Sequence, residues 1–242
     1  MLRNVKELTG YRILSIDDIL GKLKDIFFDE IEWNIRYLVA DTGKWLKGRR
    51  VLISPSSCGT PNWGAKIIPV SLTKQEIENS PDISEKIPVS VAIEKELAQY
   101  YQWPAYWTTP GAFPVGNDSK SAEKVENIEK TIHVRSTEEV IGYRILAKNG
   151  EIGHVDDFIL EDDTWIIRYM IVDTRNWLPG RKVLISPQWV EKLDWKNQQV
   201  HIHLLREIIE KGPVYDPEHP VSREYEDQLF ELYGVKKYWK SI

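Results

Sequence analysis

Cysteine is nearly absent from this chain, and long apolar runs are absent altogether. Among its 242 residues Cys58 is the single cysteine, which excludes an intrachain disulfide and a cysteine-based zinc site. No stretch approaches the roughly 20 apolar residues that a membrane-spanning helix needs. The first residues also lack the apolar core of a secretory signal peptide. We therefore expect a soluble protein of the reducing cytoplasm, which reaches a membrane only through a partner.

An excess of positive charge and the common catalytic motifs are missing as well. The formal net charge is −5 and the sequence pI is about 5.7, whereas a nucleic-acid surface needs clustered Lys and Arg. The sequence contains no glycine-rich phosphate loop between a strand and a helix, and no recognised hydrolase or metalloprotease motif. We expect no enzyme activity, no cofactor, no metal and no nucleic-acid partner.

What the sequence does contain is one pattern written twice, 132 residues apart. A repeat of about a hundred residues is long enough to form a small domain with its own core. We therefore predict a first repeat at 1–107, a linker at 108–133 and a second repeat at 134–242. Two similar units favour an internal pseudo-twofold in which matching surfaces meet. The clearest matches are Gly10–Leu14 with Gly142–Leu146, Ile35–Tyr37 with Ile167–Tyr169, and Leu52–Pro55 with Leu184–Pro187.

Each repeat is expected to contain short strands followed by helices. Short strands between turn residues favour a small antiparallel barrel, which leaves no exposed sheet edge. Pro69 lacks a donor for the strand ladder, which places the last strand of the first repeat at an edge or a bulge. Thr73 and Ser90 are typical N-caps of a short and a longer helix. The expected fold class is therefore mainly β with helical tails. In the first repeat the strands are expected at 11–16, 21–29, 33–40, 51–53 and 66–72.

The second repeat carries the clearest likeness to a known family. Its segments Gly150–Phe158, Trp165–Thr174 and Trp177–Pro187 resemble the PRC-barrel family. The helical tail that ends in Tyr-Trp resembles stand-alone bacterial members with two barrels. The resemblance implies two tandem PRC-type β-barrels used for protein–protein contact, without a common catalytic site. The first repeat departs from the family pattern at Asp17–Asp18 and at Asn34.

The loop after the third expected strand is the main candidate site in each repeat. Aromatic and Arg side chains such as those in this loop dominate the energetics of many protein interfaces. The alternative is structural: Asp and Thr hold the turn, Trp covers the end of the barrel and Gly permits the bend. The predicted interaction loops contain Asp41, Trp45, Arg49, Asp173, Trp177 and Arg181.

Two arginines in the middle of strands form a second candidate. In the expected register Arg36 lies beside Asp25, and Arg168 lies beside Asp157. Each arginine could bind an anion. The simpler interpretation is an ion pair within each barrel that also fixes the strand register.

The remaining candidates are single residues and the aromatic tails. His201 and His203 share a strand face, but no third metal ligand accompanies them. Cys58 has no neighbouring His that would make it a nucleophile. The Tyr- and Trp-rich tails at 100–107 and 232–239 either form a docking surface or pack back on the fold, and packing is favoured.

Together these features favour a non-enzymatic cytoplasmic adaptor that binds an unidentified protein partner. One alternative is a small-molecule site or an unrecognised enzyme between the two barrels, using the Asp, Arg and Trp side chains of the loops. Another is association with ribosomes or RNA, which requires a basic surface that an acidic chain disfavours.

Overall fold

The computed structural model describes residues 1–46, 49–82, 89–105, 134–174, 180–234 and 237–240. The chain forms two compact units. The first-repeat unit is Leu8–Glu138, and the second-repeat unit consists of Met1–Glu7 and Glu139–Ile242. In these units the opening residues of each repeat belong with the other repeat. The expected linker at 108–133 lies wholly within residues 106–133, which the structure does not describe.

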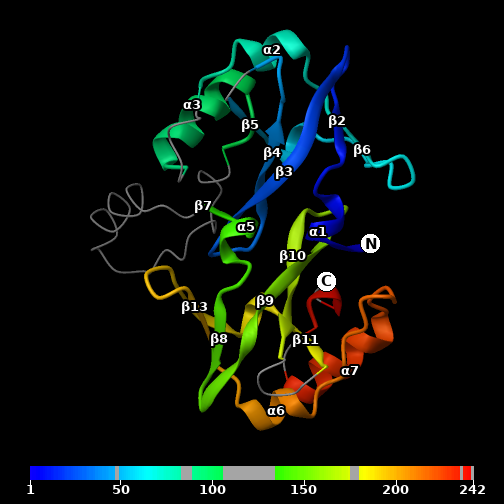
Figure 1. Cartoon of the computed structure of the whole chain (residues 1–242), viewed down its shortest axis with the longest axis vertical. Helices are drawn as coiled ribbons and strands as arrows, with labels where there is room; N and C mark the ends of the chain where they lie inside the picture. The colour runs from blue at the N-terminus through cyan, green and yellow to red at the C-terminus, as the bar shows by residue number, and fades with distance from the viewer. Residues whose placement is uncertain (47–48, 83–88, 106–133, 175–179, 235–236, 241–242) are drawn as a thin grey trace. The chain divides into compact units, whose positions relative to one another are not determined.

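The first-repeat unit is built on a six-stranded sheet (Figure 1). Its strand order is β5-β4-β3-β2-β6, and β7 pairs with β3 outside this path. The long strand β3 pairs with β2 near its start, where Lys22 lies opposite Arg12, and with β7 near its end, where Phe27 lies opposite Ser136. The strands are β2 (Arg12–Leu14), β3 (Ile19–Asp29), β4 (Ile35–Asp41), β5 (Arg50–Ile53), β6 (Ile67–Pro69) and β7 (Val134–Ser136).

The expectation of a purely antiparallel fold is wrong. β2 and β6 pair in parallel, with Ile13 opposite Ile68. A parallel pair needs a long return connection, and the chain from β2 to β6 supplies it by running through β3, β4 and β5. β6 ends the strand order and contains Pro69, as the missing backbone donor predicts. Among the described residues neither sheet closes on itself, so the observed fold is mainly β with two mixed sheets.

Helices in the first-repeat unit begin where the capping residues predict. Thr73 accepts a hydrogen bond from the Glu76 amide, and the Glu76 carboxylate accepts one in return from the Thr73 amide. Ser90 stands at the N-cap of the longer helix. That helix packs on the sheet through Ile93 and Leu97, which join a core of strand residues. The helical elements are η1 (Pro55–Ser57), α2 (Lys74–Glu78) and α3 (Val91–Tyr101).

The second-repeat unit has the same strand arrangement, displaced by 132 residues along the chain. Its sheet runs β11-β10-β9-β8-β13-β12, and β1 pairs with β9 outside this path. Again β8 and β13, the counterparts of β2 and β6, pair in parallel. The strands are β1 (Leu2–Asn4), β8 (Arg144–Ala147), β9 (Gly150–Glu161), β10 (Ile166–Asp173), β11 (Lys182–Ile185), β12 (Val190–Asp194) and β13 (Gln199–Ile202).

Short helices follow the sheet of the second-repeat unit as they do in the first. Ser222 caps the longest one by accepting a hydrogen bond from the Tyr225 amide, and Gly234 ends it in a left-handed conformation. The elements are η3 (Pro187–Trp189), α6 (Arg206–Glu210), α7 (Arg223–Tyr233) and η4 (Tyr238–Lys240). Two one-turn helices, α1 (Val5–Leu8) and α5 (Thr137–Val140), follow the opening strands β1 and β7.

The opening strands are exchanged between the repeats. β1, at the blue end of the chain in Figure 1, lies antiparallel to β9, with Leu2 opposite Glu161. β7 lies antiparallel to β3, with Val134 opposite Asp29. Since Leu2 and Val134 are equivalent positions, as are Asp29 and Glu161, the exchange is reciprocal.

Candidate functional site

The candidate loop of the first repeat folds onto its own unit. Asp41 is exposed at the end of β4, and its Oδ1 accepts a hydrogen bond from the Gly43 amide at 2.9 Å. The indole Nε1 of Trp45 donates to the Leu20 carbonyl oxygen at 2.7 Å, and Lys74 Nζ lies 4.9 Å from the centre of the Trp45 ring. These contacts agree with the structural interpretation of the loop, in which Asp holds the turn and Trp covers the fold.

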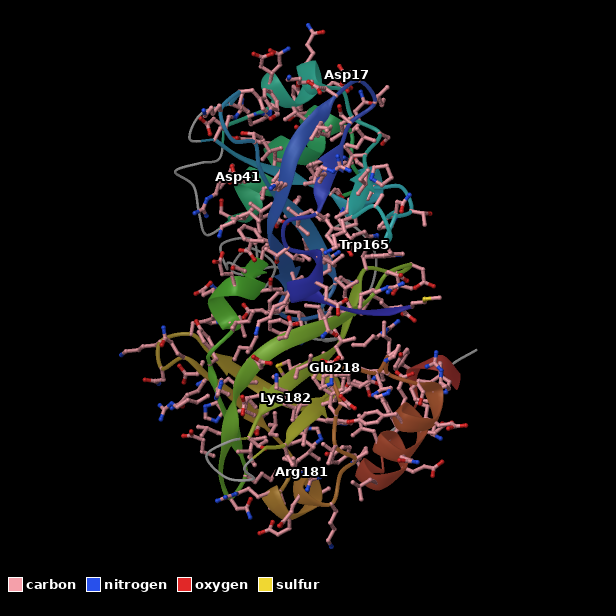
Figure 2. All side chains as sticks on the ribbon, turned by 45° about the vertical axis from the view of Figure 1, so that its right-hand side comes forward. Asp17, Asp41, Trp165, Arg181, Lys182 and Glu218 are labelled. Carbon is pink, nitrogen blue, oxygen red and sulfur yellow. The ribbon has the colours of Figure 1, made fainter. Side chains whose placement is uncertain are left out.

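The two loop arginines hold the ends of short helices. Arg49 donates to the carbonyl oxygens of Glu78 (2.7 Å) and Ser80, just after α2. Arg181, shown in Figure 2 close to α6, donates to the carbonyl oxygens of Glu210 (2.9 Å) and Gly212 (2.7 Å). Carbonyl groups at a helix C-terminus lack intrahelical donors and carry partial negative charge, so a guanidinium stabilises them. Both arginines therefore have a structural task.

Near the remaining loop residues, the backbone of Asp173 comes very close to Gly153. Asp173 is buried at the end of β10, and the neighbouring Thr174 donates its hydroxyl to the Arg181 carbonyl oxygen at 2.8 Å. The carbonyl of Asp173 lies so close to Gly153 that a Cβ added there would be 2.0 Å from the oxygen. Only glycine fits this position. Trp177, the last predicted interaction residue, lies outside the described residues.

The predicted pairing of Arg36 with Asp25 and of Arg168 with Asp157 is wrong. Arg36 Nε donates to Asp29 Oδ2 at 3.1 Å, and the guanidinium of Arg168 donates to Glu161 Oε2, at 2.9 Å from its Nε. In the observed register Asp25 lies opposite Val39 and Asp157 lies opposite Ile171, so neither aspartate is a cross-strand neighbour of the arginine. The arginines are thus engaged in ion pairs within their own sheets, four residues further along the neighbouring strand than expected.

The two aspartates instead receive the exchanged opening segments. Asp157 Oδ1 accepts the Lys6 amide at 3.1 Å. At the equivalent place Asp25 Oδ1 accepts the Glu138 amide at 3.2 Å and the Thr137 hydroxyl at 3.0 Å. Burial raises the pKa of Asp157 to about 6 and also raises the pKa of Asp25, while these hydrogen bonds oppose the shift. Sequence reasoning missed this role, although conservation of both aspartates between the copies could have indicated it.

A buried Tyr–Glu pair in each unit was also not predicted. The Tyr37 hydroxyl donates to Glu94 Oε1 at 3.1 Å, and the Tyr169 hydroxyl donates to Glu226 Oε1 at 2.7 Å. Both glutamates are almost completely buried. Burial and the adjacent Glu226 carboxylate raise the pKa of Tyr169 well above its ordinary value, so the phenol stays protonated and acts as a donor. These pairs tie α3 and α7 to their sheets.

The aromatic tails pack on the fold where the structure describes them. The Tyr101 and Trp103 rings stack with centroids 4.3 Å apart, and Trp103 Nε1 donates to Ser57 Oγ at 2.6 Å. In the second-repeat unit Tyr238 donates to Glu226 at 2.7 Å, and its ring contacts Phe230. The favoured packing interpretation is confirmed for these residues, and 106–107 lie outside the described part of the tails.

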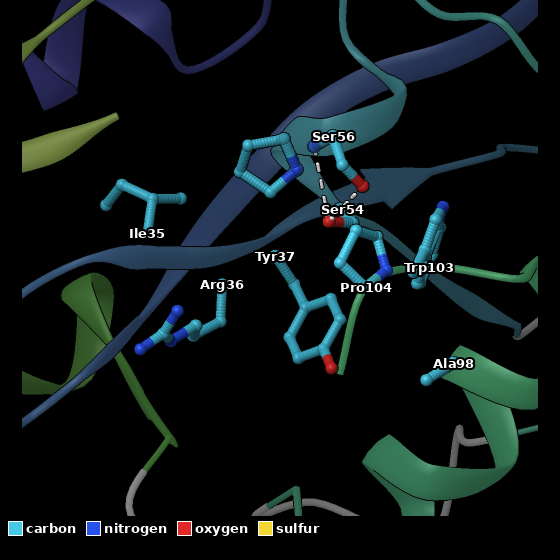
Figure 3. A pocket seen from close by; sticks show the side chains of 9 residues that line it. Ile35, Arg36, Tyr37, Ser54, Ser56, Ala98, Trp103 and Pro104 are labelled. Atoms are coloured by element: carbon cyan, nitrogen blue, oxygen red, sulfur yellow. Dashed lines mark hydrogen bonds between the residues drawn. The ribbon is translucent and has the colours of Figure 1, made fainter. Parts of the chain in front are cut away.

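A small pocket opens in the first-repeat unit between the sheet and α3 (Figure 3). Its volume is about 130 Å³, and its walls include Arg36, Tyr37, Ala98 and Trp103, with Ser54 and Ser56 hydrogen-bonded to each other at one side. Pockets for small organic ligands typically enclose about 300–1,000 Å³. The pocket is therefore too small for a ligand of that class.

Cys58, His201 and His203 were the single-residue candidates. Burial raises the pKa of the Cys58 thiol to about 12, so it carries no nucleophilic thiolate near neutral pH. His201 lies on β13, and His203 is exposed just beyond it. Within the described segments, no three His, Cys, Asp or Glu side chains are grouped as a metal site would need.

An exposed apolar tip lies at the end of a hairpin in the first-repeat unit. Leu14 and Ile19 are cross-strand neighbours at the end of the β2–β3 hairpin and are 37% and 45% exposed. Ile16, in the turn, is 69% exposed. We call these three residues the apolar tip. In Figure 2 the adjacent Asp17 marks the position of this turn at the end of the hairpin.

Hydrogen bonds fix the apolar tip to the N-terminus of α2. Asp17 Oδ1 accepts the Lys74 amide at 2.9 Å, and Lys74 Nζ donates to Asp18 Oδ2 at 2.7 Å. These bonds lower the pKa of both aspartates. The Ser15 hydroxyl closes the turn by donating to the Asp18 carbonyl oxygen at 2.7 Å. The tip is therefore a preorganised surface.

The second-repeat unit keeps this hairpin but not its apolar surface. Asn149 accepts the Arg206 amide at 2.9 Å, as Asp17 accepts that of Lys74. The positions equivalent to Ile16 and Ile19 are the exposed residues Lys148 and Glu151. The geometry of the turn is thus common to both repeats, whereas the apolar surface belongs to one.

Comparison with known proteins concerns part of the first repeat. No described helix is both long enough and apolar enough to cross a membrane. No curated protein matches the chain. Residues 2–76, which include β2 to β6 and the apolar tip, match the PRC-barrel domain. This part of the first repeat is therefore similar to the PRC-barrel domain.

Proposed function

We propose that this protein is a non-enzymatic, cytoplasmic adaptor that binds another protein through the apolar tip of its first-repeat unit. The observation that carries the proposal is the exposure of Leu14, Ile16 and Ile19 on a turn that is already rigid. Exposed apolar clusters of this kind are typical of interaction sites. A fixed turn also loses little conformational entropy when a partner binds.

The repeat supplies an internal comparison in support of this proposal. If the apolar tip were needed for folding, the second repeat would need it too, yet Lys148 and Glu151 stand there. The predicted loop residues support the site less well, since Arg49 and Arg181 already donate to helix carbonyls. We keep the loops as a secondary contact surface.

We extend the PRC-type interpretation to the second repeat on the basis of its strand arrangement. The order β11-β10-β9-β8-β13 repeats β5-β4-β3-β2-β6 at a shift of 132 residues, including the parallel pair. Two tandem PRC-type barrels therefore remain our interpretation of the chain. A pseudo-twofold between them stays a prediction.

The test replaces the apolar tip with the residues of the other repeat. In Ile16→Lys/Ile19→Glu, both side chains become those of the equivalent second-repeat positions. Val214→Lys is the matched control, because Val214 is 52% exposed in the second-repeat unit. Affinity capture from native cells after crosslinking should recover a specific protein with the unaltered chain and with the control, and lose it with the double variant.

The same experiment distinguishes the rival functions. Recovery of the same protein by the double variant would refute the apolar tip as the binding site. Turnover of a small molecule by the purified chain, without a captured protein, would refute the adaptor function itself. Co-sedimentation with ribosomes at low salt would favour the RNA alternative, which the net charge of −5 opposes.

A further inference from the structure

The outer part of each long strand accepts the opening segment of the other repeat. β9 pairs with β1 over three residue positions, Leu2 to Asn4, and β3 pairs with β7 over the equivalent three, Val134 to Ser136. Both pairings are antiparallel, and a short extended segment that joins an existing sheet edge in this way is a common mode of peptide recognition.

Further contacts of backbone and side-chain groups extend each pairing beyond the strand. At the β9 edge the Asp162 amide donates to the Met1 carbonyl oxygen at 2.9 Å, and Lys6 Nζ lies 2.8 Å from Asp156 Oδ1. At the β3 edge the Ser136 hydroxyl donates to Asp25 Oδ2 at 2.5 Å. Charged groups of opposite sign therefore supplement the backbone ladder at the β9 edge.

Buried apolar side chains anchor the exchanged segments. Val134 is 2% exposed and belongs to the core of the first-repeat unit, together with Phe27 and Val89. Val5 is 4% exposed just after β1. Burial of such side chains makes each opening segment part of the unit that receives it.

The carboxylates of Asp25 and Asp157 fix the position of the opening segment that docks beside them. Each accepts the amide of the residue two positions after the strand, Glu138 in one case and Lys6 in the other. Glu138 and Lys6 are equivalent positions in the two repeats, so the same recognition occurs twice.

We infer that the outer edges of β3 and β9 are strand-docking sites whose partner is the opening segment of a second copy of the repeat. In this chain both copies are present in one polypeptide, and each completes the other. The repeats are thus held together by reciprocal exchange as well as by the covalent connection between them. Cutting that connection leaves a paired particle.

Hydrogen–deuterium exchange on the full chain tests on which repeat each opening segment docks. In Asp157→Ala the Lys6 amide loses its acceptor, 151 positions away in the sequence, and should exchange about tenfold faster, while Glu138 is unaffected. In Asp25→Ala the Glu138 amide should accelerate and Lys6 should not. Each variant is the control for the other.

The opposite assignment would overturn the inference. If each opening segment docked on its own repeat, Asp25→Ala would release Lys6 and Asp157→Ala would release Glu138. Unchanged hydrogen–deuterium exchange rates of the Lys6 and Glu138 amides in both variants would also overturn the inference.

A second measurement does not depend on the stability of these variants. A protease site inserted at 108–133 of the otherwise native chain allows the folded protein to be cut once. The two fragments should elute together in size-exclusion chromatography at the mass of the uncut chain. Separation of the fragments under native conditions would contradict the docking of each opening segment on the other repeat.

Discussion

Replacing Arg181 with alanine should destabilise the second-repeat unit by about 3 kcal/mol. The guanidinium donates to two carbonyl oxygens, those of Glu210 and Gly212, at 2.9 and 2.7 Å. A hydrogen bond that involves a charged group contributes roughly 1.5–3 kcal/mol. Interaction with the C-terminus of α6 adds roughly 0.3–1 kcal/mol. The two bonds share one side chain, so their contributions do not add in full.

The matched control is Arg144, which is 53% exposed and lies 3.6 Å from Glu151. An exposed pair of this kind contributes at most about 1 kcal/mol. Urea unfolding followed by tryptophan fluorescence should therefore show a much larger loss for Arg181→Ala than for Arg144→Ala. Arg181→Lys should be intermediate, because lysine cannot form the planar fork. Equal losses for the two alanine variants would refute the structural role of Arg181.

Three further predictions concern the backbone, the thiol and the pH dependence of stability. Gly153→Ala should lower the free energy of unfolding by more than about 3 kcal/mol, because its Cβ would lie 2.0 Å from the Asp173 oxygen. Gly142→Ala, with open space around the added Cβ, should lower it by about 1 kcal/mol, as measured by thermal unfolding. Cys58, with its pKa raised to about 12 by burial, should react with a thiol reagent more than about a hundredfold more slowly in the folded than in the urea-unfolded protein, and equal rates would contradict this. The folded-state pKa of Asp157 is raised to about 6 by burial, above an unfolded value of about 3.9, so its contribution to stability is complete below about pH 4 and is lost as the pH rises through 6. Asp157→Asn should remove this part of the pH dependence of the unfolding free energy, and an unchanged profile would show that the carboxylate does not titrate there.

Local signals predicted the helices because their causes are local. Thr73 and Ser90 stand at N-caps since their positions before a helical pattern depend only on nearby backbone groups. Pro69 likewise indicated the place of its strand. Parallel pairing of β2 with β6 was missed because alternation of side chains does not encode the direction of a neighbouring strand.

The strand exchange could not be predicted from the repeat. Both copies carry a similar opening segment and a similar receiving strand, so pairing within a repeat and pairing between repeats satisfy the same sequence pattern. The error in the Arg36 pairing has a different origin. The observed register sets Asp25 opposite Val39, and Arg36 contacts Asp29 at the end of β3 instead. A shift of register by an even number of residues keeps the alternation of faces, so the alternation did not reveal the correct pairing.

The predicted interaction loops and the proposed apolar tip differ in how the two copies compare. The repeated loop was selected because both copies contain Asp, Trp and Arg, and such agreement marks what the fold itself requires. The apolar tip was overlooked because Leu14 and Ile16 stood at the end of an expected strand and Ile19 in the short turn after it. Their exposure becomes visible only when the hairpin is seen to end the sheet. Our proposal therefore rests on a difference between the copies.

Site-specific photo-crosslinking in living cells tests the proposed binding site most directly. A photoreactive residue is placed at Ile16 in one variant and at the equivalent Lys148 in another, so that the two probes occupy the same turn of the two repeats. The account predicts a discrete protein adduct from position 16 and none from position 148. Equal adducts from both positions, or an adduct from position 148 alone, would contradict it.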